Sequence, residues 1–396
     1  MLIFVLNAGS SSLKYQLIDI KSKELKASGL VERIGIDGIL KHEIGENKKL
    51  TFELPIPTHK EAIELVLRIL TNNETKVINS IDEIKAIGHR VVHGGEYFKG
   101  SAIVDDEVIR KIEELIPLAP LHNPANILGV KICQELMPKV PNVVTFDTAF
   151  HQTMPMENFL YAVPYADYTE HHLRKYGFHG TSHYYVSQEA IKLLNKKDSK
   201  VIVCHLGNGS SVCAVKDGKS ISTSMGLTPL EGLVMGTRSG DIDAGVIPYL
   251  MEKKGLNHIQ ILDYLNKKSG ILGVSGVSSD LREVIKAAND GDKRSKIAIT
   301  MLCDRIKKYL CSYAGLMHGV DAICFTAGIG ENSDLIREKV CEGLEFMGIE
   351  IDKDKNSKRE KGNREINTKN SKTKIFVIPT NEELVIATDT YNLLKK

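Results

Sequence analysis

Apolar runs of strand length that end in polar, glycine-rich turns recur along the chain. Residues 3–6 lead into Gly9-Ser10-Ser11, and residues 201–206 lead into Gly209-Ser210-Ser211, about 200 residues later. In each case a second apolar and polar alternation follows, so the pattern predicts two strand hairpins. A repeat at this separation indicates a duplicated domain, because solenoid repeats have much shorter periods.

Strands and amphipathic helices alternate through the rest of the first half. Thr58 and Glu61 form a capping-box pattern before a helical run, and Ser80 with Glu83 repeats that pattern before a strand. The predicted elements are the helix 62–70, the strand 86–92, the helices 105–116 and 124–137, and the buried strand 140–146. The first domain is therefore expected to end near residue 150.

The second half repeats the alternation of strands and helices. The predicted elements are a helix after Ser182, a hairpin over 201–223, long helices within 240–318, a strand over 322–326, a helix after Asn332 and a strand over 375–378. Thr380 with Glu383 predicts the start of a terminal helix. The charged stretch 352–374 reads as a solvated loop of little functional weight. We expect an α/β protein with domains 1–150 and 151–380, and with helix 381–396 packing back on the first domain.

Composition and charge favour small-molecule chemistry. The 52 basic and 50 acidic residues give a net charge of +2, so no overall field attracts nucleic acid or an anionic membrane. No apolar run reaches membrane-spanning length, and the apolar N-terminus turns polar at Asn7 and reads as a strand rather than a signal peptide. The seven scattered cysteines contain no Cys-x-x-Cys pair and are expected to be reduced core residues of a cytoplasmic protein.

The two hairpin turns suit an anion. Glycine lets backbone N–H groups and serine hydroxyls converge on a phosphate, so a nucleotide is the first candidate ligand. Other glycine-rich stretches match known fingerprints only in part. Gly218-Lys219-Ser220 lacks the earlier glycine of a P-loop, and Gly328 with Gly330 lacks the third glycine of a dinucleotide fingerprint. A helix beginning beside Gly328 and Gly330 would still suit a nucleotide.

Other polar clusters allow several interpretations. His179 and His183 have the spacing of a zinc-binding helix, but Gly180 and the expected N-cap Ser182 lie between them, so the rings need not share a face. The serines of the first turn lack the strand-to-helix elbow of a serine hydrolase, which favours phosphate binding. Arg90, at a predicted strand end, could be a surface residue or an anion clamp.

Taken together, these segments resemble the acetate kinase family over nearly the whole chain. The matching segments are residues 6–14, 89–95, 117–124, 146–151, 176–183, 205–209, 235–241, 328–332 and 379–384. The resemblance implies two duplicated ribonuclease H-like, actin-like ATPase domains with the active site in the cleft between them, and a homodimer. It implies Mg²⁺-dependent transfer of the ATP γ-phosphoryl group to acetate, giving acetyl phosphate and ADP.

The resemblance also implies roles for individual residues. Arg90 would contact the substrate carboxylate, and His179 with Arg238 the transferring phosphoryl group. Asp147 would be the active-site acid, with an electrostatic or water-mediated metal role, because acetate is already ionised at pH 7 and needs no general base. Asn7 and Glu382 would hold Mg²⁺, with Mn²⁺ as an alternative.

Two larger sets complete the implied site. The acetate pocket would comprise Val92, Leu121, His122, Phe178 and Pro229, beside Arg90. ATP would contact Ser10, Ser12, Lys14, His205, Leu206, Gly207, Asn208, Gly209, Asp280, Leu281, Arg282, Gly328, Ile329, Gly330, Glu331 and Asn332. Asp280 could equally be a helix N-cap.

Three other functions stay open at this stage. A kinase for propionate or another short-chain acid is nearest, because one methylene in an apolar pocket changes binding by only about 1 to 3 kcal/mol. A nucleotide-switched binding protein shares the expected architecture with actin and Hsp70, and fold alone does not decide function. A serine hydrolase would use Ser10 or Ser11 as its nucleophile.

Overall fold

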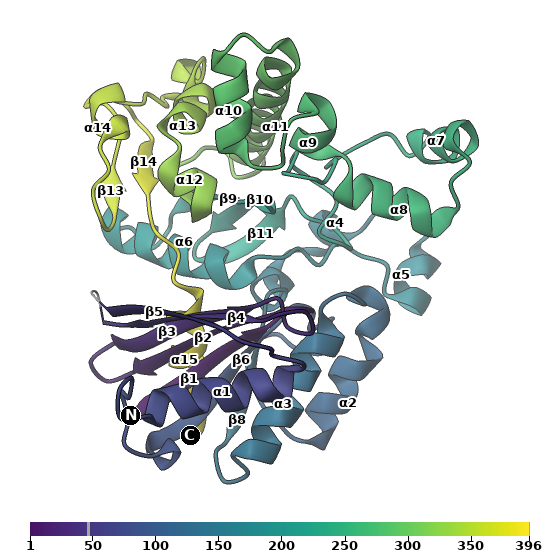
Figure 1. Cartoon of the computed structure of the whole chain (residues 1–396). Helices are drawn as coiled ribbons and strands as arrows, with labels where there is room; N and C mark the ends of the chain where they lie inside the picture. The colour runs from purple at the N-terminus through teal and green to yellow at the C-terminus, as the bar shows by residue number, and fades with distance from the viewer. Residues whose placement is uncertain (46–47, 396) are drawn as a thin grey trace. The chain divides into compact units, whose positions relative to one another are not determined.

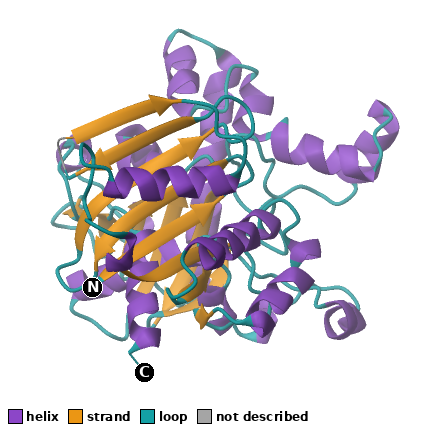
Figure 2. Cartoon of the chain, turned by 60° about the horizontal axis from the view of Figure 1, so that its bottom comes forward, coloured by secondary structure: helices purple, strands orange, loops and turns teal. Residues whose placement is uncertain are grey.

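The computed structural model describes residues 1–45 and 48–395, and the chain divides into two compact units. Unit 1 comprises Met1–Phe150 and Asn381–Lys396, and unit 2 comprises His151–Thr380. Each unit is built on one sheet with helices packed against it (Figures 1 and 2).

Unit 1 has an eight-stranded sheet in the order β5-β4-β3-β2-β1-β6-β8-β7. β1 pairs antiparallel with β2 and parallel with β6, and β6 pairs parallel with β8. The strands are β1 Leu2–Ala8, β2 Ser12–Asp19, β3 Glu24–Glu32, β4 Ile39–Ile44, β5 Lys48–Glu53, β6 Ile84–Val91, β7 Ala102–Ile103 and β8 Asn142–Phe146. The first hairpin is thus confirmed.

The alternation of side chains along β1 explains how this sheet is covered. Phe4 and Leu6 belong to the core shared with α1 (His59–Thr71) and α3 (Asn123–Leu136), whereas Ile3 and Val5 pack with residues of α15 (Glu382–Leu394). Successive strand residues point to opposite faces, so one apolar strand supports helices on both. The remaining helical elements are α2 Asp106–Glu114, η1 Ile81–Glu83, η2 Ile116–Leu118 and η3 Ala149–Thr153, whose last residues belong to unit 2.

The C-terminal helix α15 packs on β6, β1 and β8, as the sequence predicted. A Cβ atom at Gly88 of β6 would lie 2.6 Å from Ile386 Cγ2 and 2.7 Å from Thr390 Oγ1. Only glycine permits this close approach of helix and strand. The predicted cap was wrong by one residue, because the Asn381 side chain accepts the backbone N–H of Leu384, while the Thr380 hydroxyl donates to Ser182.

Unit 2 repeats the same sheet core. Its order is β11-β10-β9-β12-β14-β13, with β9 antiparallel to β10 and parallel to β12, and β12 parallel to β14. The strands are β9 Lys200–Leu206, β10 Ser210–Lys216, β11 Lys219–Thr223, β12 Ala322–Thr326, β13 Arg364–Glu365 and β14 Lys374–Val377. A meander of three antiparallel strands followed by two parallel ones is therefore common to both units, and the predicted duplication and α/β class are confirmed.

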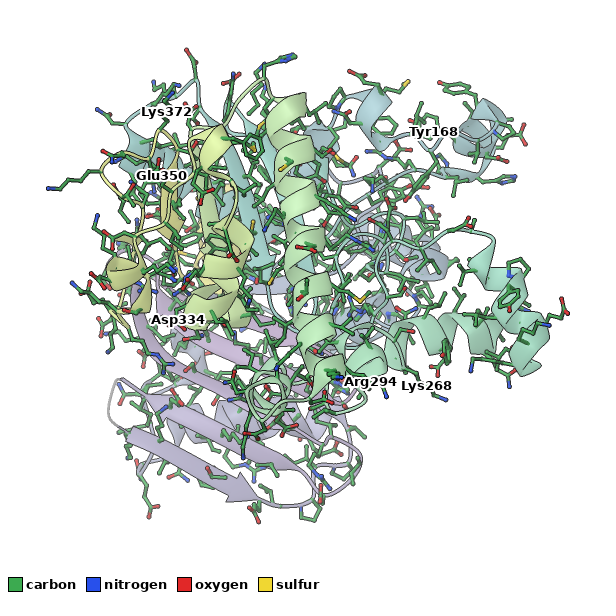
Figure 3. The ribbon with its side chains drawn as sticks, turned by 90° about the horizontal axis from the view of Figure 1, so that it is seen from above. Tyr168, Lys268, Arg294, Asp334, Glu350 and Lys372 are labelled. Carbon is green, nitrogen blue, oxygen red and sulfur yellow. The ribbon has the colours of Figure 1, made fainter. Side chains whose placement is uncertain are left out.

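The helices of unit 2 pack around this sheet. They are α4 Met156–Phe159, α5 Tyr165–His171, α6 Gly180–Leu194, α7 Val246–Lys254, α8 His258–Lys267, α9 Gly270–Ser275, α10 Leu281–Asn289, α11 Lys293–Leu316, α12 Ala327–Asn332, α13 Asp334–Cys341, η4 Glu345–Met347 and α14 Lys353–Ser357. The long helix α11, with Arg294 labelled near its start in Figure 3, contacts α9 and α10. Its buried face forms part of the hydrophobic core of unit 2. None of the described helices is long and apolar enough to cross a membrane.

Three local predictions in unit 2 were wrong. A helix was expected only after Asn332, but residues 328–332 already belong to the short helix α12. Helix α6 starts at Gly180 with His179 as its N-cap, so Ser182 lies inside the helix. The charged stretch 352–374 was expected to be solvated, but it contains α14, and Asn356 and Asn367 are each only 2 % exposed. All seven cysteines are free, and all but the half-buried Cys311 are buried, as predicted.

Candidate active site

Three predicted site residues of unit 1 meet at one edge of its sheet. Asn7 lies near the end of β1, Arg90 near the end of β6, and Asp147 directly after β8. These strands are neighbours and run parallel, so their carboxyl ends lie together. Arg90 Nε donates to Asp147 Oδ1 at 3.0 Å, Nη2 donates to Oδ2 at 2.5 Å, and Nη1 donates to Asn7 Oδ1 at 3.3 Å.

Arg90 forms an ion pair with Asp147 and stays positively charged at this edge. Asp147 is 1 % exposed and the Arg90 side chain 24 %. Burial opposes the charge of Arg90, but the negative charges of Asp147, Glu382 and Glu383 outweigh it and raise the pKa of Arg90 above its ordinary value. A planar guanidinium held by two parallel bonds has a fixed orientation. The hydrogens of Arg90 that Asp147 does not use can therefore point in a defined direction.

The start of α15 adds two carboxylates to the same neighbourhood. Burial raises the pKa of Glu382 to about 7, and the nearby negative charges of Asp147 and Glu383 act in the same direction, against the attraction of Arg90 and Lys14. Glu383 forms an ion pair with Lys14 of β2. The first turn of the last helix thus lies beside Arg90 and Asp147.

In unit 2, two histidines at the start of α6 converge on one serine hydroxyl: His179, its N-cap, and His183, in its first turn. Ser211 Oγ of β10 lies 2.9 Å from His179 Nδ1 and 2.7 Å from His183 Nε2. The sequence left the relative direction of the two rings open, and the structure shows that both point to Ser211. His179 has a φ of 57°, a left-handed conformation that is costly outside glycine and that clusters at functional sites. No group of three or more metal-binding side chains occurs among the described residues.

The ring of His179 is also held by stacking. It lies parallel to the ring of His205, with centroids 4.1 Å apart and an interplanar angle of 18°. His205 Nδ1 lies 2.8 Å from Ser182 Oγ, which in turn accepts the hydroxyl of Thr380. His205 is thus placed to orient His179.

Arg238 lies against the second hairpin turn and next to His179. A Cβ atom on Gly209 would be 3.4 Å from Arg238 Nη1 and 3.8 Å from His179 Cε1. Arg238 Nη1 donates to the Pro229 carbonyl at 3.0 Å, and within the described part of the chain Arg238 forms no ion pair. Burial lowers the pKa of Arg238. A partly buried cation without a carboxylate partner is suited to an anionic ligand.

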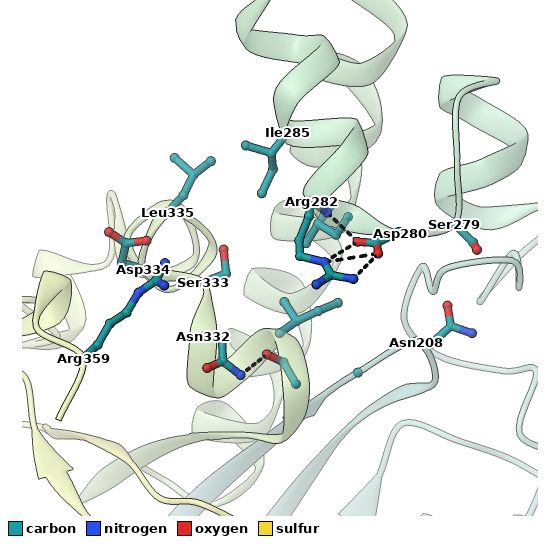
Figure 4. Close-up of a pocket in the computed structure, with 14 residues that line it drawn as sticks. Asn208, Ser279, Asp280, Arg282, Ile285, Asn332, Ser333, Asp334, Leu335 and Arg359 are labelled. Atoms are coloured by element: carbon teal, nitrogen blue, oxygen red, sulfur yellow. Dashed lines mark hydrogen bonds and ion pairs between the residues drawn. The ribbon is translucent and has the colours of Figure 1, made fainter. Parts of the chain in front are cut away.

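A cavity of about 880 Å³ opens beside the same turn (Figure 4). Its predicted lining residues are Gly207, Asn208, Asp280, Leu281, Arg282, Gly328, Ile329 and Asn332; Ser279, Ile285, Ser333, Asp334, Leu335 and Arg359 also line it. The volume lies within the range of small-molecule and cofactor sites. The sequence missed Arg359 because it belongs to the charged stretch that we read as a solvated loop.

Asp280 is the N-cap of α10, as one of its two interpretations predicted, and it also lines the cavity. Its carboxylate accepts the backbone N–H of Arg282 as the N-cap of α10 and also binds the Arg282 guanidinium. These hydrogen bonds lower the pKa of Asp280 to about 2. Asp280 and Arg282 therefore stand as a charged pair at the wall of the cavity, as Figure 4 shows.

The buried Arg337 holds helix α12, which contributes Gly328, Ile329 and Asn332 to the cavity lining. Arg337 of α13 is 2 % exposed and donates to the carbonyls of Gly330 and Glu331 in α12, at 2.8 and 2.9 Å. It also donates to Asn356 Oδ1 and to the Asn356 carbonyl, at 2.7 and 2.8 Å. Arg337 therefore ties α12 to α14.

The other predicted residues lie in varied surroundings. Leu206, Val92 and Phe178 are buried and Pro229 is partly buried, whereas Leu121 is 70 % exposed and His122 precedes α3. Ser10 is exposed and Ser12 half-buried at the first hairpin. Gly330 and Glu331 bind Arg337 through their carbonyls, and Glu331 Oε1 accepts the backbone N–H of Ala327.

Comparison with known proteins gives a consistent result. Residues 2–388 match the Acetokinase family. The chain is 55% identical over 398 residues to an acetate kinase of Treponema denticola, with 100% of both chains covered. The crystal structure of Porphyromonas gingivalis acetate kinase superimposes with a TM-score of 0.95 at 47% identity, covering 99% of both chains. A propionate kinase from Francisella tularensis superimposes with a TM-score of 0.93 at 46% identity, with the same coverage. The chain belongs to the acetokinase family.

Proposed function

We propose that the chain transfers the γ-phosphoryl group of ATP reversibly to acetate, forming acetyl phosphate and ADP. The observation that carries this proposal is Arg238, a partly buried cation without a carboxylate partner, next to His179 and the Gly207–Gly209 turn. The relatives named as acetate kinases supply the identity of the acceptor.

The chemistry requires positioning and charge neutralisation more than proton transfer. Acetate is ionised at neutral pH, and its approach to a nucleotide phosphate brings together two negative groups. Phosphoryl transfer is accelerated mainly by alignment and by cations placed on the transferring group. Arg238 and His179 would donate to the oxygens of that group, and Arg90 would hold the acetate carboxylate.

Asp147 would act through Arg90. Its two oxygens accept two of the five N–H groups of Arg90, which leaves others to bind a carboxylate in a fixed plane. The acetate methyl group would contact Val92, Leu121, His122, Phe178 and Pro229, as the family resemblance implies.

ATP would occupy the cavity described above, with its phosphates toward the Gly207–Gly209 turn. Asn208, Asp280, Leu281, Arg282, Gly328, Ile329 and Asn332 line that cavity. Ser10, Ser12, Lys14, His205, Leu206, Gly209, Gly330 and Glu331 complete the proposed nucleotide contacts.

Magnesium, or manganese in its place, would be held by Asn7 and Glu382. The oxygen donors at this edge, from Asn7, Asp147 and Glu382, suit a hard cation that keeps several water molecules. When bound, the ion would neutralise phosphate charge. The family resemblance also implies a homodimer, and the seven free cysteines support a cytoplasmic location.

Propionate is the second candidate acceptor, favoured by the similarity to a propionate kinase structure. Measurement of kcat/KM for ADP formation with acetate, propionate and butyrate distinguishes the two. Acetate should give the highest value, and a higher value for propionate would change the assignment.

The role of Arg238 is tested by Arg238→Ala, with the exposed Arg68 of α1 changed to alanine as the control for charge. We expect kcat to fall by about 10³-fold or more in Arg238→Ala, the range for arginines that stabilise a transferring phosphoryl group. The circular dichroism spectrum should stay unchanged, and Arg68→Ala should retain its rate. Near-normal turnover of Arg238→Ala would refute the proposed role.

A further inference from the structure

The Ser211 hydroxyl lies between two imidazole rings and has no other partner in the described residues. Its oxygen is 2.9 Å from His179 Nδ1 and 2.7 Å from His183 Nε2, and its side chain is fully buried. A hydroxyl carries one hydrogen and can donate to only one of these nitrogens. The other nitrogen must then carry a hydrogen and donate to Ser211.

Two directions of donation satisfy all three groups. In the first, His183 Nε2–H donates to Ser211, and the Ser211 hydroxyl donates to His179 Nδ1. In the second, His179 Nδ1–H donates to Ser211, and the hydroxyl donates to His183 Nε2. The tautomers of the two rings are therefore coupled through one hydroxyl group.

The surroundings of His183 favour the first direction. His183 is fully buried, and its Nδ1 has no hydrogen-bond partner. The second direction would put the proton of a neutral His183 on this Nδ1 and leave a buried N–H donor unpaired, which is rare in native proteins. Burial lowers the pKa of His183 well below its ordinary value, as do the neighbouring rings of His151 and His205, so the ring is neutral.

We propose that Ser211 and His183 are positioning residues that hold His179 in the tautomer with its proton on Nε2. The proposal rests on the proposed function insofar as His179 donates to the transferring phosphoryl group. With Nδ1 accepting from Ser211, the remaining nitrogen is a donor, as that task requires. The stacked ring of His205 holds the plane of His179, and the Ser211 hydroxyl fixes which nitrogen donates.

The tautomer is measured directly in the full-length protein by ¹⁵N NMR of labelled histidines, without nucleotide. His179→Gln and His183→Gln identify the signals of the two rings. We expect His179 to show a protonated Nε2 and an unprotonated Nδ1, and His183 to show a protonated Nε2. A protonated Nδ1 on His179 would overturn the proposal.

Activity of substituted enzymes gives a second test. Ser211→Ala removes the hydroxyl, and we expect kcat to fall about ten- to a hundredfold, the range seen when groups that orient a functional histidine are lost. The KM values for ATP and acetate should change less than twofold. His183→Gln keeps an N–H donor toward Ser211 and should retain most of kcat, whereas His183→Leu should match Ser211→Ala.

Ser220→Ala is the matched control. Ser220 is also a buried serine whose hydroxyl lies 2.8 Å from a histidine nitrogen, His151 Nδ1, but neither residue bonds to Ser211. Its kcat should stay within twofold of the unsubstituted enzyme. A Ser211→Ala enzyme as active as Ser220→Ala would overturn the proposal.

These results separate the proposal from the function on which it rests. If His179→Gln keeps the full rate while the Nε2–H tautomer is observed, the phosphoryl role of His179 fails and the coupling through Ser211 stands. If His179→Gln loses the rate and His179 carries its proton on Nδ1, the coupling fails and the phosphoryl role stands.

Discussion

Replacing Arg337 by methionine should both destabilise the protein and weaken ATP binding. The Arg337 guanidinium makes four hydrogen bonds from a nearly water-free position, two to carbonyls of α12 and two to Asn356. None of its acceptors is a carboxylate, and burial lowers the pKa of Arg337 to about 10. The cation is therefore hydrogen-bonded only to neutral acceptors, and the charge of Asp334 gives it further support.

The cost of the substitution follows from the acceptors left behind. Each buried acceptor that loses its donor costs about 1 to 3 kcal/mol, and methionine relieves the expense of burying a charge. With partial relaxation of Asn356, we expect a net loss of about 3 kcal/mol in the free energy of unfolding, measured by urea denaturation. Because Gly328, Ile329 and Asn332 form the same short helix and line the cavity, loosening α12 should raise KM for ATP about tenfold, or about 1.4 kcal/mol.

Two comparisons make the Arg337 prediction specific. KM for acetate should not change, since Arg90 and the other proposed acetate contacts lie outside α12, α13 and α14. Lys339→Met in the same helix removes a positive charge without these bonds and should change the free energy of unfolding by less than about 0.5 kcal/mol, as expected of ordinary surface substitutions. Equal effects of Arg337→Met on both KM values, or a destabilisation below about 1 kcal/mol, would refute the reasoning.

Two further predictions concern the cavity and the buried histidines. Arg359→Ala removes a cation from the cavity lining and should raise KM for ATP about three- to tenfold, worth about 0.7 to 1.4 kcal/mol. Lys361→Ala, at an exposed neighbouring position, should leave KM for ATP unchanged. Equal KM values for the two variants would show that Arg359 does not contact the nucleotide. Burial lowers the pKa of His89 to about 4, so this neutral ring contributes stability that is present above pH 6.5 and is lost as the pH falls through 4. Urea denaturation should show that the free energy of unfolding of His89→Gln decreases less between pH 6.5 and 4 than that of the unsubstituted protein, by up to about 3 kcal/mol. The same pH dependence in both proteins would contradict this prediction.

The family resemblance assigned Asn7, Arg90 and Asp147 to one site, whereas the residues alone left Arg90 open between a surface residue and an anion clamp. Asn7, Arg90 and Asp147 each follow an apolar run, and the parallel order of β1, β6 and β8 brings them together. The two hairpins were predicted because a turn of glycine and serine between two apolar runs is a local signal. Local patterns therefore predicted the strands and turns, and the parallel pairing of those strands decides which side chains meet.

Local patterns failed where a distant side chain decides the structure. Serine is a better N-cap than histidine, so the start of α6 was placed at Ser182, yet His179 takes the left-handed conformation and begins the helix. Its ring is held by Ser211, which reaches it from a strand 32 residues away in sequence. No helical spacing rule contains that contact, and the convergence of His179 and His183 was missed for this reason.

The prediction that residues 352–374 form a solvated loop failed for an energetic reason. Polar residues are mostly exposed, but they can be buried when every hydrogen-bonding group has a partner. Asn356 satisfies this condition, because its side chain accepts from Arg337 and donates to the Asp334 carbonyl. A composition rule cannot detect such a pair, since the two residues lie on different elements and each looks exposed in isolation.

Three arginines show why residue type alone could not assign the site. Arg90 is matched by the carboxylate of Asp147, and Arg337 is matched by four neutral acceptors. Arg238 has one carbonyl and a methionine sulfur, and no carboxylate in the described structure. The desolvation of the Arg238 charge is therefore not offset by its hydrogen bonds, and an anionic ligand would stabilise that charge. Among these three, Arg238 makes the fewest hydrogen bonds and is therefore the best candidate for an anionic ligand. Its substitution tests the proposed function, whereas that of Arg337 tests the architecture.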